Sequence, residues 1–335
     1  MLNTDTRAKS IIHWLSHTLK LEIKQFEAAS SDASFRRYFR VIHSKGQHIV
    51  MDAPPEKEDT EPFIRTAQLF KKYGVNVPEI YQQELEQGFL LLEDFGSECF
   101  LDKLTTNNAS NLYVNAINRL CELQTAIPLT DCQLPHYDET LLTNEIMIFY
   151  QWFVEKFLQQ NMPNTIKESL NQQLISSALE QPKVCVHRDF HSRNLMVTAD
   201  ESLGIIDFQD AVIGAITYDL VSLLRDCYVD WPEHQINQWK KLYFDKMIEH
   251  KLINVDIETF DCWFDLMGLQ RHLKAIGIFA RLHLRDNKSN YLDDIPRTLN
   301  YVTQICAKYP ELNEFNDFLT HTLLPAYKKT YKNKR

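Results

Sequence analysis

Apolar and polar positions follow two different patterns along the chain. Short runs rich in β-branched and aromatic residues predict strands over residues 23–28, 38–42, 48–53, 80–83 and 89–92. Apolar positions at helical spacing predict two helices in the same region, over residues 5–20 and 63–73. The first ninety residues therefore form a small region of mixed, strand-rich structure.

After Gly96 the pattern becomes mainly helical. The predicted helices cover residues 112–125, 140–160, 166–179, 218–227, 233–251, 257–284, 295–309 and 314–327. Two apolar strands interrupt them around residues 184–186 and 205–206, and each leads into a polar segment. We predict an α+β protein with two lobes, a small β-rich N-lobe over residues 1–93 and a large, mainly helical C-lobe over residues 94–335.

Composition excludes several classes of protein. The 335 residues include 36 basic and 45 acidic ones, so the net charge of −9 argues against broad binding of nucleic acid. Seven scattered cysteines without a CxxC pair indicate reduced thiols. The N-terminus lacks a signal-peptide pattern, and no apolar run is long enough to span a membrane. We expect a cytoplasmic protein without a membrane partner, and a monomer.

The strongest chemical signal is His187-Arg188-Asp189, with Asn194 five residues after the aspartate and Asp207 at the end of the next apolar strand. This order and spacing is the one that phosphoryl transfer requires. Asp189 would accept the proton of an attacking hydroxyl. Asn194 and Asp207 would hold the Mg²⁺ that bridges the phosphates of ATP, because Mg²⁺ prefers a few oxygen ligands. His187 is better explained as a packing residue that shapes the loop.

Two stretches of the N-lobe are candidates for binding the nucleotide. A hairpin of small residues followed by arginines would let backbone amides approach phosphate oxygens; its candidate residues are Ser31, Asp32, Ala33, Ser34, Phe35 and Arg36. The alternative is an ordinary surface turn. At Glu93 and Phe95 a buried strand leads into a short polar segment. This segment is either a hinge whose backbone contacts adenine or an ordinary strand end.

These motifs together resemble the aminoglycoside phosphotransferase family of small-molecule kinases, which has a protein-kinase-like fold. The second motif is Ile-Asp-Phe-Gln-Asp over residues 206–210 rather than Asp-Phe-Gly, and no Ala-Pro-Glu segment precedes Tyr218-Asp219-Leu220. Asp219 is there expected to cap a helix. Protein substrates are therefore not expected.

Further stretches resemble one branch of this family over nearly the whole chain; they are residues 34–40, 51–56, 90–96, 269–274 and 277–282. That resemblance implies transfer of the γ-phosphate of ATP to the anomeric hydroxyl of an amino sugar, N-acetylmuramate or N-acetylglucosamine, in peptidoglycan recycling. One position departs from the superfamily, because Met51 stands where kinases place a phosphate-binding lysine. Arg36, Arg37 and Arg40 are the nearest replacements.

Residues that contact the acceptor are harder to predict. Arg188 and His191 flank Asp189, and Arg188 either braces that aspartate or contacts the substrate. Arg225 begins the segment over residues 225–231, which contains a tryptophan and two aspartates. This segment either binds a sugar or is a helix end whose tryptophan lies in the core. Arg271 belongs to a stripe of cations that includes Lys274, for which a solvated helix face is the more common explanation.

Two alternatives remain open for the function. The same chemistry would serve another hydroxyl acceptor, such as an aminoglycoside, an amino alcohol or a different sugar. A catalytically silent nucleotide-binding regulator would be consistent with Met51, although it would not need Asp189, Asn194 and Asp207 together.

Overall fold

The computed structural model describes residues 5–31, 35–198 and 201–332, and the chain divides into two compact units. The first unit comprises residues 1–106 and 193–210, and the second comprises residues 107–192 and 211–335. The first is rich in strands and the second is mainly helical, so the predicted α+β class is confirmed. The predicted lobe boundary between Glu93 and Asp94 stays a prediction.

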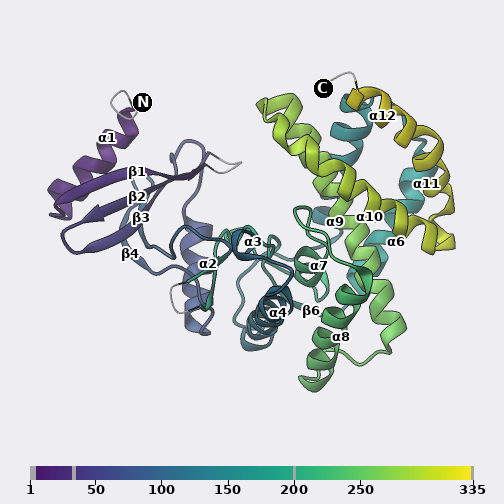
Figure 1. Cartoon of the computed structure of the whole chain (residues 1–335), viewed down its shortest axis with the longest axis horizontal. Coiled ribbons are helices and arrows are strands. Elements are labelled where there is room, and N and C mark those ends of the chain that lie inside the picture. The colour runs from purple at the N-terminus through teal and green to yellow at the C-terminus, as the bar shows by residue number, and fades with distance from the viewer. Residues whose placement is uncertain (1–4, 32–34, 199–200, 333–335) are drawn as a thin grey trace. The chain divides into compact units, whose positions relative to one another are not determined.

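The first unit is built on a five-stranded antiparallel sheet (Figure 1). Its strands follow the order β1-β2-β3-β5-β4. They are β1 (Ile23–Ser31), β2 (Arg37–His43), β3 (Gly46–Asp52), β4 (Ile80–Glu84) and β5 (Phe89–Glu93). Every predicted strand of this region is present, because alternate apolar residues such as Phe39 and Val41 face a buried core.

Three helices and a hairpin complete the first unit. Helix α1 (Thr6–His13) and the following π-helix (Trp14–Thr18) place Ile11, Trp14 and Leu15 in the core of the sheet. The hairpin consists of β7 (Leu195–Val197) and β8 (Leu203–Ile205). Helix α2 (Glu61–Lys72) packs Phe63 against Phe208, with ring centroids 4.8 Å apart. A short helix, α3 (Phe100–Lys103), follows the sheet.

The second unit is an assembly of helices with one short strand pair. The helices are α4 (Ala109–Ala126), α5 (Glu139–Ile148), α6 (Asn164–Glu180), α7 (Tyr218–Leu224), α8 (Glu233–Glu249), α9 (Ile257–Asp286), α10 (Ile295–Lys308), α11 (Asn313–Phe318) and α12 (Leu324–Lys332). Strand β6 (Lys183–Val186) pairs with β9 (Val212–Ala215), a strand that the sequence pattern did not predict.

Helix α9 is the element around which the second unit packs. It contacts α5, α6, α7 and α10, and the last three are labelled near it in Figure 1. At Gly277 a Cβ atom would lie 2.6 Å from the backbone of Phe149, so the missing side chain lets α9 approach the end of α5 closely. One face of α9 is thereby fixed against α5, the helix that carries Glu145.

Besides the π-helix that follows α1, two predicted helices of the second unit contain a change of hydrogen-bond register. Residues 140–160 form α5 followed by a π-helix over Phe149–Phe157, and residues 314–327 include a second π-helix over Leu319–Leu323. A π-turn changes the apolar period only slightly, so the pattern predicts the helix but not its register. Among the described residues, no helix has the length and apolarity that crossing a bilayer requires, and all seven cysteines are free.

Candidate active site

The catalytic segment leaves β6 at Val186 and turns sharply through His187 and Arg188. The His187 side chain is fully buried, and its Nδ1 accepts a hydrogen bond from the backbone N–H of Asp189 at 3.2 Å. Its ring meets the edge of Phe190 at 6.0 Å. Arg188 has a left-handed backbone with φ of 77°, a strained conformation for a residue with a side chain. The predicted packing role of His187 is confirmed.

Asp219 holds this turn from the first turn of α7. Its carboxylate accepts the backbone N–H of His187 at 2.7 Å and of Arg188 at 2.9 Å. The prediction that Asp219 caps its own helix was wrong, because Thr217 occupies the N-cap position and the carboxylate bonds the catalytic loop instead. Burial raises the pKa of Asp219 to about 7, against the opposing effect of the two N–H bonds.

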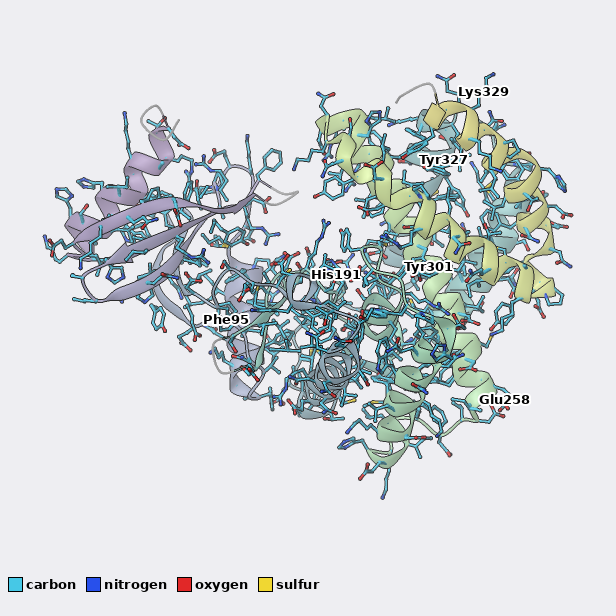
Figure 2. The ribbon with its side chains drawn as sticks, in the orientation of Figure 1. Phe95, His191, Glu258, Tyr301, Tyr327 and Lys329 are labelled. Atoms are coloured by element: carbon cyan, nitrogen blue, oxygen red, sulfur yellow. The ribbon has the colours of Figure 1, made fainter. Side chains whose placement is uncertain are left out.

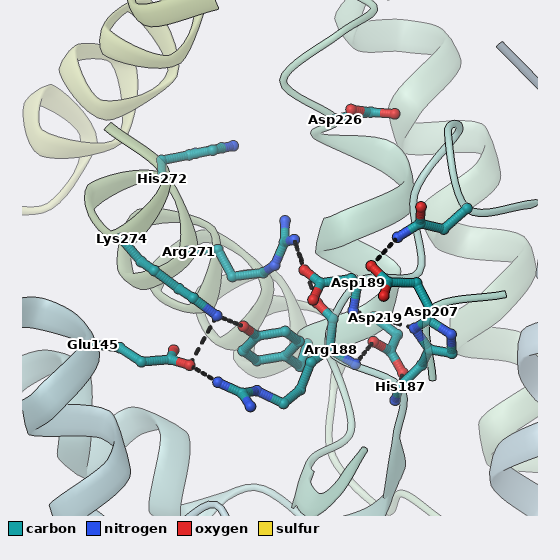
Figure 3. Close-up of polar contacts among 12 residues, drawn as sticks. Glu145, His187, Arg188, Asp189, Asp207, Asp219, Asp226, Arg271, His272 and Lys274 are labelled. Atoms are coloured by element: carbon teal, nitrogen blue, oxygen red, sulfur yellow. Dashed lines mark hydrogen bonds and ion pairs between the residues drawn. The ribbon is translucent and has the colours of Figure 1, made fainter. Parts of the chain in front are cut away.

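A second carboxylate, Glu145 on α5, holds two cations beside the loop (Figure 3). It pairs with Arg188 and, at 2.8 Å, with Lys274 of α9, and it accepts the hydroxyl of Tyr137 at 2.5 Å. Burial alone would raise the pKa of Glu145, but Lys274 and Arg188 lower it below its usual value. Glu145 is therefore a buried anion that fixes both cations, and the contact of Arg188 with the substrate stays a prediction.

Asp189 itself is half-buried, with 37% of its side chain exposed. Burial raises its pKa, but the positive charges of Lys274, His191, Arg271 and Arg188 outweigh that effect and lower the pKa to about 2. Figure 3 shows the Arg271 side chain directed from α9 toward Asp189, and the two form an ion pair at 4.0 Å. The carboxylate is therefore ionised at neutral pH and accessible to a hydroxyl group.

Asn194 and Asp207 lie at the two ends of the β7–β8 hairpin. The backbone N–H of Ile206 donates to the Asn194 carbonyl at 3.0 Å, which brings the two side chains together. Each oxygen of the Asp207 carboxylate accepts an amide N–H, from Asn194 at 3.3 Å and from Gln209 at 2.8 Å. Asp207 also has a left-handed backbone, with φ of 65°.

The donors of this pair fit a hard cation such as Mg²⁺. The described part of the chain contains no group of three or more His, Cys, Asp and Glu residues that would hold a metal by themselves. One carboxylate and one amide oxygen are hard ligands, and Mg²⁺ completes its shell with water and phosphate oxygens. The donor set of Asn194 and Asp207 is therefore suited to a magnesium ion carried by a nucleotide.

The candidate phosphate hairpin is only partly described. Asp32, Ala33 and Ser34 lie outside the described residues, and Ser31 is the last residue of β1. Phe35 is 60% exposed, and its backbone N–H donates to Glu58 at 3.0 Å. Arg36 is buried and lies 4.0 Å from the same carboxylate.

The predicted replacements for the missing lysine have carboxylate partners within the first unit. Met51 is fully buried in β3. Arg37 bonds Asp52 at 2.5 Å, and Arg40 bonds Asp94 at 2.6 Å and the carbonyl of Gly96 at 2.8 Å. Arg37 and Arg40 therefore serve at least to tie the sheet together.

The two hinge candidates lie at the end of β5. The Glu93 side chain accepts the backbone N–H of Glu79 at 3.1 Å. Phe95, labelled in Figure 2, packs on β8, where a Cβ atom on Gly204 would lie 2.4 Å from the ring. The hinge is thereby packed on the hairpin that carries Asp207, and its contact with adenine stays a prediction.

Two acceptor candidates have different surroundings. The ring of His191 meets Tyr228 edge-on at 5.5 Å, next to Asp189 in the loop. Arg225 instead bonds Glu233 at 2.7 Å, lies over the ring of Tyr301, and lines a polar cavity of about 540 Å³ between α8, α9 and α10. Asp189 is not among the described residues that line this cavity.

Sequence reasoning missed Glu145 and misplaced Lys274. The prediction that the cationic stripe of α9 is solvated was wrong for Arg271 and Lys274, whose side chains are only 11% and 14% exposed. A signal for Glu145 was present, because it lies three residues after Leu142 and four before Phe149, on the apolar face of its helix. An acidic residue at such a position needs buried cations.

Comparison with known proteins agrees with this site. N-acetylmuramate/N-acetylglucosamine kinase of Pseudomonas putida is 40% identical over 329 residues, which cover 94% of this chain and 96% of the relative. The kinase of the same name from Pseudomonas aeruginosa is 42% identical over 295 residues, covering 87% and 86%. The Neisseria meningitidis kinase of that name is 41% identical over 293 residues, covering 85% and 86%.

Solved structures share the fold at low sequence identity. Choline kinase LicA from Streptococcus pneumoniae has a TM-score of 0.65 at 14% identity, over 91% of this chain and 100% of its own. Spectinomycin phosphotransferase, solved with ADP and spectinomycin, has a TM-score of 0.60 at 15% identity, over 87% and 93%. The fold is therefore protein-kinase-like, as predicted. Residues 25–251, which include both halves of the Asp189 and Asp207 motif, match the phosphotransferase enzyme family, and the chain belongs to that family.

Proposed function

We propose that this protein is an ATP-dependent kinase that phosphorylates the anomeric hydroxyl of N-acetylmuramate and N-acetylglucosamine in peptidoglycan recycling. The observation that carries the proposal is the likeness, at 40–42% identity over most of the chain, to three kinases named for these two sugars. The kinase chemistry is independently supported by Asp189, a half-buried and ionised carboxylate in an HRDxxxxN loop.

In the proposed reaction the anomeric hydroxyl donates a hydrogen bond to Asp189. The hydroxyl oxygen attacks the γ-phosphorus of ATP, the bond from that phosphorus to the bridging oxygen of the β-phosphate breaks, and the hydroxyl proton passes to Asp189. The products are the sugar 1-phosphate and ADP. Because the cations around it lower its pKa to about 2, Asp189 chiefly orients the hydroxyl and takes the proton late.

The remaining residues of the proposed site would bind the nucleotide and its metal ion. Asn194 and Asp207 would hold Mg²⁺, which supplies positive charge to the phosphate oxygens when bound. We assign the hairpin from Ser31 to Arg36 to the phosphates and the Glu93–Phe95 joint to adenine. Backbone amides of the hairpin would then do part of the work of the missing lysine, since Arg37 and Arg40 are paired with carboxylates. Because ATP is the phosphate donor, we propose that the reaction takes place in the cytoplasm. We also propose that the protein is a monomer.

The test is ATP consumption by the purified protein with magnesium and N-acetylmuramate, N-acetylglucosamine or kanamycin as the acceptor. We expect turnover on the two N-acetyl sugars, and we expect Asp189→Asn to lower kcat by at least about 100-fold. Turnover on kanamycin alone would mean that the acceptor is an aminoglycoside, and it would leave the proposed mechanism unchanged. Binding of ATP without turnover on any acceptor would favour the silent regulator.

A further inference from the structure

Three permanent cations face Asp189 from the loop and the helices next to it. They are Arg188, Arg271 and Lys274. Several carboxylates lie in the same region, among them Glu145, Asp219 and Asp226. The three cations differ in how closely their partners hold them.

Arg271 is the least closely held of the three cations. Arg188 bonds Glu145, and Lys274 bonds both Glu145 at 2.8 Å and the hydroxyl of Tyr218 at 3.2 Å. Arg271 has a looser set of partners: it lies 4.0 Å from Asp189, donates to the Arg188 carbonyl at 3.4 Å, and covers the ring of Tyr218. The Arg271 guanidinium is thus held mainly by packing. Fewer of its hydrogen-bond donors have close acceptors than do those of the Lys274 ammonium group.

The two proposed acceptors differ in charge at one position. N-acetylmuramate carries a lactyl ether that ends in a carboxylate, a few bonds from the anomeric hydroxyl, and N-acetylglucosamine has a neutral hydroxyl there. A carboxylate brought next to Asp189 and the phosphates of ATP is repelled by both. An anionic acceptor therefore needs a cation close to Asp189 that still has hydrogen-bond donors to offer it, as Arg271 does at Nε.

We propose that Arg271 binds the carboxylate of N-acetylmuramate and thereby sets the preference of the enzyme for this acceptor over N-acetylglucosamine; this rests on the proposed function. A guanidinium suits the role, because its planar donors match a carboxylate in two parallel hydrogen bonds. Glu145 contributes indirectly, since it occupies Arg188 and Lys274 and leaves Arg271 for the substrate.

The experiment compares kcat/KM for the two sugars in the wild type, Arg271→Gln and Arg271→Lys. Both acceptors should lose some activity in Arg271→Gln, because Arg271 also lies near Asp189. The ratio of kcat/KM for N-acetylmuramate to that for N-acetylglucosamine should fall by about 10- to 100-fold, the worth of a hydrogen bond to a charged group. Arg271→Lys keeps the charge without the planar pair and should restore part of the ratio.

Arg281→Gln is the matched control. Arg281 is also a partly buried arginine of α9, so this variant removes the same charge from the same helix, and it should leave the ratio within about twofold. An equal loss for both sugars in Arg271→Gln would overturn the proposal and reduce Arg271 to a positioning residue for Asp189. Failure of the wild type to phosphorylate either sugar would instead refute the proposed function.

Discussion

The two acidic residues of the catalytic motif, Asp189 and Asp207, are held by different kinds of polar group. Asp189 lies among the positive charges of Lys274, His191, Arg271 and Arg188, which lower its pKa to about 2 despite its burial. The two oxygens of Asp207 accept hydrogen bonds from the neutral amides of Asn194 and Gln209. Amide partners orient a carboxylate without cancelling its charge.

This difference matches the two proposed tasks. A carboxylate that receives a proton from a substrate must be ionised before the reaction, and here the protein itself supplies the positive charge that keeps it so. A carboxylate that receives a metal ion must keep its negative charge for that ion. The surroundings of each aspartate are therefore consistent with the proposed roles of Asp189 as the base and Asp207 as a metal ligand.

The largest effect should be the loss of stability in Glu145→Gln, which removes the buried anion that holds Arg188 and Lys274 beside Asp189. Arg188 and Lys274 would then be left as buried cations without their carboxylate, and breaking a buried pair in this way costs about 3–5 kcal/mol of unfolding free energy. Urea unfolding would measure the loss. Glu155→Gln is the control, because Glu155 is 45% exposed and pairs with Lys167 at 3.2 Å, and it should cost less than about 1 kcal/mol. Equal losses in both variants would show that Glu145 is not a buried organising charge.

A smaller effect, about 100-fold in kcat or roughly 2.7 kcal/mol, is expected for Asp207→Asn, because the variant keeps an oxygen ligand but loses the charge. Raising the magnesium concentration should recover part of this loss. The same titration should not rescue Asp189→Asn, which lacks a proton acceptor and not a metal ligand. Rescue of both variants by magnesium, or of neither, would remove the distinction between the two carboxylates.

The sequence predicted the fold and the chemical centre because both depend on local patterns. Alternation in the strands, helical spacing after Gly96 and the spacing of Asp189, Asn194 and Asp207 all act over short stretches. Glu145 and Lys274 could not be assigned in this way, since they are 129 positions apart in the printed sequence and meet only when α5 and α9 pack. The strand β9 was missed for a similar reason, because its four residues become a strand by pairing with β6.

Asp219 is a further case in which a local sequence pattern did not predict a contact with a distant part of the chain. Its position at the start of α7 predicts a cap, since aspartate is common at the first residues of a helix. The structure uses the carboxylate for the N–H groups of His187 and Arg188, which are more than thirty residues earlier in the chain. A local rule identified the residue as structural but gave it the wrong partner.

The smallest effect should appear in the pH dependence of stability of Asp219→Asn. Burial raises the pKa of Asp219 from 3.8 to about 7, so between these values the folded protein holds a proton that the unfolded chain has released. Raising the pH through this window therefore favours unfolding of the wild type, and asparagine does not titrate. The stability advantage of the wild type over Asp219→Asn should be largest near pH 4 and should shrink toward pH 7, on top of a constant cost of about 1 kcal/mol for one lost N–H bond.

Thermal unfolding of both proteins from pH 2 to pH 8 measures this advantage, and Asp256→Asn provides a control of opposite sign. Asp256 is the N-cap of α9, and the hydrogen bonds from Thr259 lower its pKa below 3.8. Its contribution to stability is therefore present at neutral pH and is lost as the pH falls below 3.8. A wild-type advantage over Asp219→Asn that grows toward pH 7 would mean that the two backbone N–H groups outweigh burial, and that Asp219 holds the catalytic loop as an anion.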